Sequence, residues 1–301
     1  MYLEAAKHSV EPALTVTEQD TYLYQSGWYR RVIGPFFGSD DPAFFVSVDR
    51  MSSLFSEKEK ETRIMIITLK DGSKKEYAEA KSVIDIAADI SEGLARVACA
   101  GEVDGEVVDL RHVVDKDCEL SILTFEDEGG KGAFRHTTSH IMAQAIKRLY
   151  PDVKLAIGPS IADGFYYDID SENPITTEDL AKIEVEMKKV VKEALPITRF
   201  TKSREEAIAF FKEKNEPYKV ELIEDLPEDA EISFYQQGEF VDLCAGPHLM
   251  TTKPVKAFKL TSIAGAYWRG DEHNQMLTRI YGTAFTKKAE LDAYLTMMEE
   301  A

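Results

Sequence analysis

The sequence predicts an α+β protein, in which a small β-grasp domain precedes a larger α+β domain. Strand-like runs and helical stretches follow one another in mixed order, which is typical of this class. An acidic, glycine-rich stretch at residues 126–132 divides them into two blocks. The first block contains a hairpin, one helix and further strands, and the second is longer and carries several helices.

The composition indicates a cytoplasmic protein. The 301-residue chain has 44% hydrophobic residues and 30% charged residues. No apolar run approaches the roughly 20 residues that span a bilayer, and the N-terminus lacks the layout of a signal peptide. The three cysteines, Cys99, Cys118 and Cys244, are widely spaced, which suggests a reducing compartment without disulfides. We therefore expect no membrane partner.

The net charge of −18 argues against a general nucleic-acid coat, because phosphate contacts require clustered lysine and arginine. Basic residues nevertheless gather locally in the second block, at residues 147–154, 199–204 and 253–259. These clusters permit a nucleic-acid ligand without requiring one.

Residues 1–61 are rich in aromatic side chains and in turn-forming glycine and proline. The alternating charges at residues 57–61 are typical of a solvated linker. We assign this stretch as an N-terminal extension of unknown role.

The first domain is predicted over residues 62–125. Residues 63–77 are expected to form a β-hairpin with its turn at Asp71-Gly72, and Ser82 is expected to cap a helix. Further short strands follow, which together suggest a ubiquitin-like β-grasp. No clustered titratable side chains indicate catalysis, so we expect a binding or docking module.

The stretch at residues 126–132 is expected to be a linker. A helix carrying His136 and His140 should follow it, and a later helix should begin with the capping box of Ser203 and Glu206. Strands are predicted at residues 163–168, 232–235, 239–242 and 258–260.

Two segments about a hundred residues apart each place two coordinating, titratable side chains four positions apart. On a helix, His136 and His140 would share one face. Cys244 and His248 flank a Gly-Pro turn and can converge on one point. The residue types leave three functions open: a zinc site, a Cys244 thiolate nucleophile, and a metal-free hydrolytic pocket. Composition and spacing alone favour zinc.

Several longer motifs accompany these two segments in the second block. They are His136–His140, Ala156–Pro159, Asp163–Asp168, Asp242–His248, Gly265–Asp271 and Leu277–Thr283. In order and spacing they resemble the N-terminal half of bacterial threonyl-tRNA synthetase. The resemblance covers about residues 62–301. It implies a TGS domain at residues 62–125, a threonyl/alanyl-type editing domain at 131–285, and at 286–301 the start of a helix that leads to a catalytic core.

The resemblance also implies catalytic roles. His136 matches the family's water-positioning histidine, and His140 and His248 match its supporting histidines. Lys219 matches its catalytic lysine. A lysine acts as a base only if its pKa is lowered, whereas as a donor to an oxyanion it needs no shift.

Three further residues acquire substrate-binding roles from the resemblance. Asp242 would hold the substrate ammonium, and Cys244 would line the pocket. Tyr166 and its neighbour Tyr167 are candidates either for stacking on the terminal adenosine or for core packing, and we assign the stacking role to Tyr166. No metal is expected; if zinc does bind, its ligands would be His136, His140, Cys244 and His248.

The reaction implied is hydrolysis of mischarged seryl-tRNA(Thr), with tRNA(Thr) as the partner and no cofactor. ATP, magnesium, zinc and homodimer contacts would belong to the aminoacylation core, which is absent from this chain. Residues 1–61 match nothing in that family. Two alternatives are a stand-alone factor that edits in trans, and a non-catalytic TGS-containing protein that binds RNA or a protein partner.

Overall fold

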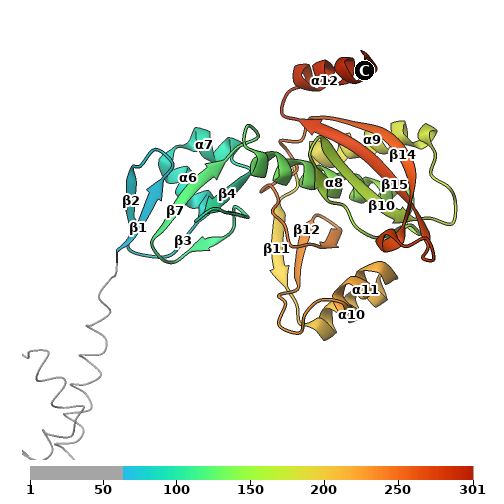
Figure 1. The fold of residues 1–301 in the computed structure, drawn as a ribbon, viewed down its shortest axis with the longest axis horizontal. Coiled ribbons are helices and arrows are strands. Elements are labelled where there is room, and N and C mark those ends of the chain that lie inside the picture. The colour runs from blue at the N-terminus through green and yellow to red at the C-terminus, as the bar shows by residue number, and fades with distance from the viewer. Residues whose placement is uncertain (1–63, 301) are drawn as a thin grey trace, which may run out of the picture. The chain divides into compact units, whose positions relative to one another are not determined.

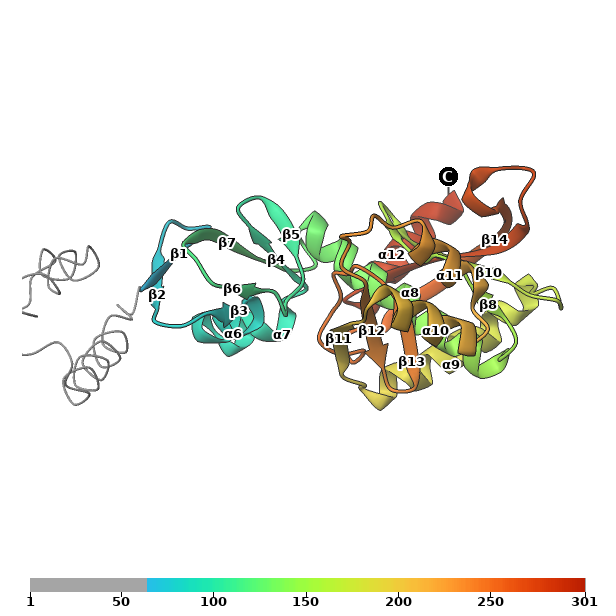
Figure 2. The same ribbon diagram turned by 90° about the horizontal axis from the view of Figure 1, so that it is seen from below.

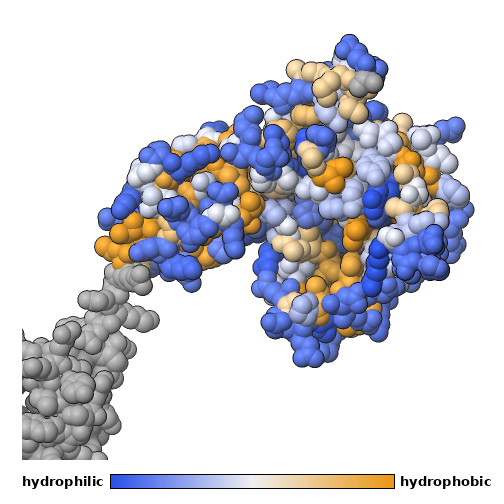
Figure 3. Space-filling model, viewed as in Figure 1, coloured by the Kyte–Doolittle hydropathy of each residue, from blue (hydrophilic) through white to orange (hydrophobic). Residues whose placement is uncertain are grey.

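The computed structural model describes residues 64–300, and it confirms the predicted α+β class (Figure 1). The extension predicted at residues 1–61 lies outside the described residues. Within residues 64–300, no helix combines the length and the apolar character needed to span a membrane. The described surface in Figure 3 is largely hydrophilic, with smaller hydrophobic areas.

The β-grasp domain is built around a five-stranded mixed sheet with strand order β2-β1-β7-β4-β5. Strand β1 pairs antiparallel with β2 and parallel with β7. Helix α6 packs Val83 and Ile86 against Ile67 and Leu120, and all four are at most 1% exposed. The elements are β1 (Met65–Leu69), β2 (Lys74–Tyr77), β3 (Lys81–Ser82), α6 (Val83–Ile90), α7 (Glu92–Val97), β4 (Ala100–Val103), β5 (Glu106–Val108), β6 (Val113–Val114) and β7 (Cys118–Leu123).

Local hydrogen bonds explain the helix boundaries in this domain. The Ser82 hydroxyl accepts a hydrogen bond from the Asp85 amide and caps α6, as predicted. The single helix expected here is divided in two, because Ser91 adopts an extended backbone. Its hydroxyl then accepts a hydrogen bond from the Leu94 amide at 3.0 Å, so Ser91 ends α6 and begins α7.

The prediction of a linker at residues 126–132 is wrong, because α8 (Glu128–Leu149) begins inside this stretch. A Cβ atom at Gly130 would lie 1.8 Å from the carbonyl oxygen of Thr124, so only glycine permits this close backbone contact. The Asp127 carboxylate accepts a hydrogen bond from the Thr124 amide at 2.9 Å. The β-grasp domain therefore leads directly into the helix.

The second domain contains an antiparallel sheet with strand order β14-β15-β10-β8, and β9 also pairs with β10. Helices α8 and α9 lie side by side against this sheet (Figure 1). Phe134, Ile141, Phe165 and Ile280 belong to the core between these layers. The elements are β8 (Lys154–Leu155), β9 (Ser160–Ile161), β10 (Gly164–Asp170), α9 (Thr177–Glu193), β14 (Ala257–Tyr267), a 3-10 turn (Trp268–Gly270), β15 (Met276–Phe285) and α12 (Lys288–Glu300).

A three-stranded sheet with two short helices completes this domain (Figure 2). Phe211 and Phe234 stack in its own core, with ring centres 5.4 Å apart. The predicted capping box of Ser203 and Glu206 is present. The elements are β11 (Ile197–Thr201), α10 (Arg204–Glu213), α11 (Pro217–Glu224), β12 (Ser233–Gln237) and β13 (Phe240–Leu243).

Candidate active site

Helix α8 carries His136 and His140 into the interior of the second domain. The two imidazoles are one helical turn apart, and their ring centres are separated by 5.1 Å. A buried polar neighbour, Thr137, is satisfied within the helix because its hydroxyl donates to the Ala133 carbonyl at 2.8 Å. His140 is buried, whereas His136 keeps part of its surface accessible. Of the two, only His136 is therefore partly exposed to solvent.

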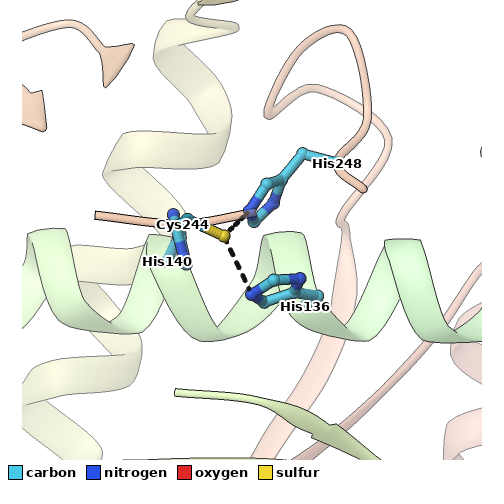
Figure 4. A group of neighbouring side chains, drawn as sticks. All are labelled: His136, His140, Cys244 and His248. Atoms are coloured by element: carbon cyan, nitrogen blue, oxygen red, sulfur yellow. Dashed lines mark hydrogen bonds between the residues drawn. The ribbon is translucent and has the colours of Figure 1, made fainter. Parts of the chain in front are cut away.

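The segment that follows β13 brings Cys244 and His248 to these imidazoles (Figure 4). The Cys244 sulfur lies 3.4 Å from His136 Nε2 and 3.2 Å from His248 Nε2. Thr137 ties this segment to α8, because its hydroxyl lies 3.2 Å from His248 Nδ1 and accepts a hydrogen bond from the Leu249 amide. The structure thus brings together four residues that the sequence places in two distant segments.

A buried ion pair lies beside this cluster. Lys219 on α11 places its Nζ 2.6 Å from Asp242 Oδ1 on β13, and both side chains are at most 3% exposed. The other carboxylate oxygen accepts a hydrogen bond from the Tyr167 hydroxyl at 2.5 Å and lies 3.5 Å from His140 Nε2. Asp242 is therefore the internal counter-ion of Lys219, and apart from this ion pair its Oδ1 is buried without a hydrogen-bond partner among residues 64–300.

Burial keeps the three histidines neutral. It lowers the pKa of His136 to about 4 and that of His140 to about 3, against the opposing attraction of the Asp242 carboxylate. Burial and the neighbouring imidazoles also lower the pKa of His248 well below its ordinary value. Each neutral ring retains one nitrogen that can accept a proton, and of the three histidines only His136 is partly exposed.

The same environment raises the pKa of the Cys244 thiol and lowers the pKa of the Asp242 carboxylate. Burial raises the pKa of Cys244 to about 12, so the thiol is protonated at neutral pH and is a poor nucleophile. Burial alone would raise the pKa of Asp242, but the charge of Lys219 and the nearby His140 outweigh it and lower that pKa. The site thus holds a neutral thiol, neutral imidazoles and a charged carboxylate paired with Lys219.

Tyr166 is not brought to this group. Adjacent residues of a strand point to opposite faces, and Tyr167 faces the interior. Tyr166 lies beneath Arg279, whose guanidinium carbon is 3.9 Å from the ring centre. The tyrosine that joins the site is Tyr167, through its hydroxyl. Phe165, Tyr167 and Ile169 are fully buried. In the sequence these residues recur at every second position, and this alternation would have identified Tyr167 as the inward-facing ring.

The residue types of the cluster also fit a metal ion. One ligand atom from each of His136, His140, Cys244 and His248 lies within 4.8 Å of the others. Three imidazoles and one thiolate form a ligand set that zinc accepts. However, the charge of Lys219 reaches the same place, because it contributes to lowering the pKa of both His136 and His140. The paired Asp242 carboxylate acts on both imidazoles in the opposite sense and more strongly, so the ion pair does not exclude a cation here.

Comparisons with known proteins match both domains. Residues 65–124 match the TGS domain, and residues 232–281 match the threonyl and alanyl tRNA synthetase second additional domain. The latter range contains Asp242, Cys244 and His248.

The chain is also similar to threonine–tRNA ligases. It is 66% identical over 235 residues to that of Acetivibrio thermocellus, covering 78% of this chain and 37% of the ligase. It is 61% identical over 241 residues to that of Caldanaerobacter subterraneus subsp. tengcongensis, covering 80% and 37%. It is 63% identical over 235 residues to that of Clostridium novyi, covering 78% and 37%. The resemblance to the N-terminal part of threonyl-tRNA synthetases is confirmed, and the chain spans little more than a third of the length of these relatives.

Proposed function

We propose that this chain, which corresponds to the TGS and second additional domains of a threonine–tRNA ligase, hydrolyses the ester bond of mischarged Ser-tRNA(Thr). The observation that carries the proposal is the contact of the partly exposed His136 and Cys244 beside the buried Lys219–Asp242 ion pair. A protein that only binds RNA needs no such buried titratable cluster.

A separate hydrolytic site compensates for the limited selectivity with which a binding pocket distinguishes serine from threonine. Serine lacks one methyl group of threonine and keeps the hydroxyl. One methyl group gives roughly 10–200-fold discrimination, below the ~10⁴ that translation needs. A second pocket can have the opposite selectivity, because it accepts serine and excludes the additional methyl group of threonine by steric clash.

Hydrolysis of an aminoacyl ester requires a positioned water, a proton acceptor and stabilisation of the oxyanion that forms. The neutral, accessible His136 suits the first two tasks. The Lys219 ammonium, held in place by Asp242 and Tyr167, supplies fixed positive charge beside the cluster. His140 and His248 pack against His136 and restrict its orientation. The Cys244 thiol, between two imidazoles, forms part of the pocket wall.

We expect this reaction to proceed without a bound metal ion or other cofactor. Protein treated with a chelator should contain well below one equivalent of zinc by elemental analysis. It should still deacylate Ser-tRNA(Thr) at the rate of untreated protein, since the chain's own imidazole and ammonium groups supply the chemistry. Untreated protein with added zinc is the matched comparison.

Two results would contradict these expectations separately. Deacylation by untreated protein no faster than in buffer would reject the proposed function and favour a binding role for both domains. Stoichiometric zinc whose removal abolishes deacylation would reject the metal-free mechanism, in favour of a zinc site formed by His136, His140, Cys244 and His248.

Replacing Cys244 with alanine should relax the selectivity of the pocket. Removing the sulfur leaves space for the methyl group of threonine, so Thr-tRNA(Thr) should begin to be hydrolysed while Ser-tRNA(Thr) hydrolysis continues. The ratio of the two single-turnover rates should fall by roughly 10–200-fold, the range expected for one methyl group. Both rates are measured on the same enzyme preparation.

The outcome also tests the nucleophile role of the thiol. A Cys244 nucleophile would form an acyl-enzyme, so the alanine variant would lose activity on both esters and wild-type protein would accumulate a seryl thioester. Trapping of that thioester would overturn the pocket-wall role.

A further inference from the structure

We propose that the β-grasp domain supplies two positioning residues, Asp109 and Arg111, to the hydrolytic site of the second domain. The inference rests on the proposed function. Both residues lie between β5 and β6, and they bind the backbone around His248, which is more than 130 positions away in the chain. Their side chains are 10% and 17% exposed, so these contacts are largely shielded from water.

Asp109 joins two elements of the site through one carboxylate oxygen. Its Oδ2 accepts hydrogen bonds from the His248 amide at 3.0 Å and from the Tyr235 hydroxyl at 2.9 Å. Its Oδ1 accepts from the amide of Arg111 at 2.8 Å and from the Arg111 guanidinium at 2.9 Å. The orientation of the carboxylate is therefore set from both sides.

Arg111 holds the backbone on the other side of the same loop. Its guanidinium donates to the Leu249 carbonyl at 2.9 Å, to the His248 carbonyl at 3.4 Å, and to the carbonyl of Ile197. Asp109 thus binds the amide of His248 and Arg111 binds its carbonyl. Together they hold both peptide groups of this residue.

Tyr235 links Asp109 to the part of the loop that carries Cys244. Its ring packs against the loop at Gly246, where a Cβ atom would lie 2.2 Å from the Tyr235 hydroxyl oxygen. The ring centre is also 4.5 Å from that of His248. Because Asp109 fixes the Tyr235 hydroxyl, it restricts the whole loop from Cys244 to His248.

These contacts define what the two residues do. They do not touch the accessible His136–Cys244 pair, so they act through the position of the loop. Misplacing a reacting group by about 1 Å can reduce a rate by about 10²-fold. The loop also carries the thiol that faces the substrate side chain, so its position should affect the choice between serine and threonine.

Substitution of Asp109 by asparagine tests this role with little change in shape. An amide offers one acceptor oxygen and one donor NH₂ group, whereas both carboxylate oxygens accept from donors here. In either orientation of the amide, the donors on one side of Asp109 therefore face the NH₂ group.

We expect Asp109→Asn and Arg111→Ala to lower the saturating single-turnover rate on Ser-tRNA(Thr) by about 10–100-fold. The enzyme concentration at half-saturation should change by less than threefold, and the ratio of serine to threonine hydrolysis should change. His112→Gln, an exposed neighbour in the same turn, is the matched control and should behave as wild type.

Each result is interpretable. Wild-type protein that fails to deacylate Ser-tRNA(Thr) would reject the proposed function itself. Active wild-type protein with unchanged rates and ratios in both variants would reject the positioning role. A rate loss that matches the loss of folded protein by circular dichroism, with an unchanged ratio of the two esters, would also reject it. Greater activity in Arg111→Lys than in Arg111→Ala, at equal folded fraction, would support it.

Discussion

Replacing His136 with alanine should lower the single-turnover rate of Ser-tRNA(Thr) deacylation by about 10²–10⁴-fold, the usual contribution of a general acid or base. The imidazole is the accessible member of the histidine cluster and is neutral at pH 7. His136 is not fully buried, so the variant should remain folded. His273→Ala serves as the control, because that imidazole is 84% exposed in the same domain.

The pH dependence of the wild-type enzyme tests the same group. A rate that needs neutral His136 is present above its folded pKa of about 4 and is lost as the pH falls through that value. The rate should therefore hold from pH 7 to about pH 5. A midpoint near 6.5, the ordinary value for histidine, would contradict the lowered pKa of His136. A fully active His136→Ala variant would exclude it as well.

Replacing Lys219 with alanine should impair both stability and activity. The side chain is 3% exposed and forms a buried ion pair with Asp242, so its removal leaves a buried carboxylate without its counter-ion. Breaking such a pair costs about 3–5 kcal/mol of unfolding free energy. Urea denaturation should show this loss, and the remaining folded protein should deacylate Ser-tRNA(Thr) slowly. The stability cost distinguishes this variant from His136→Ala.

A surface pair provides the control for Lys219. Lys182 is 67% exposed and pairs with Asp179, and such pairs contribute at most about 1 kcal/mol. The double variant Lys219→Met with Asp242→Leu removes both charges, so it should lose less stability than the sum of the two single variants. Additive losses, or a Lys219→Ala variant as stable as Lys182→Ala, would contradict the buried ion pair.

Local signals predicted most of the elements. The turn at Asp71-Gly72, the Ser82 cap and the box of Ser203 and Glu206 each depend on neighbouring residues, which a sequence displays directly. The spacing of His136 and His140 likewise predicted a shared helix face. The surroundings of Tyr166 and Asp242 depend instead on which groups lie opposite them in the fold.

Non-local contacts explain what the sequence did not reveal. Asp242 meets Lys219 and Tyr167 from two other elements, and no local pattern indicates these partners. Asp109 and Arg111 contribute to no local motif, because all their partners in the second domain are remote in sequence. Glycines at residues 129–132 have the composition of a flexible linker, although Gly130 is required by backbone contact with Thr124.

The glycine-rich start of α8 fixes how far the β-grasp domain is rotated about the axis of this helix. An α-helix turns by about 100° and advances about 1.5 Å for each residue. One inserted or deleted residue between Thr124 and His136 would therefore rotate Asp109 and Arg111 away from the loop at His248, while every side chain of the site remained present. A stretch whose composition suggests tolerance of length changes should accept no change in length, and no residue other than glycine at position 130.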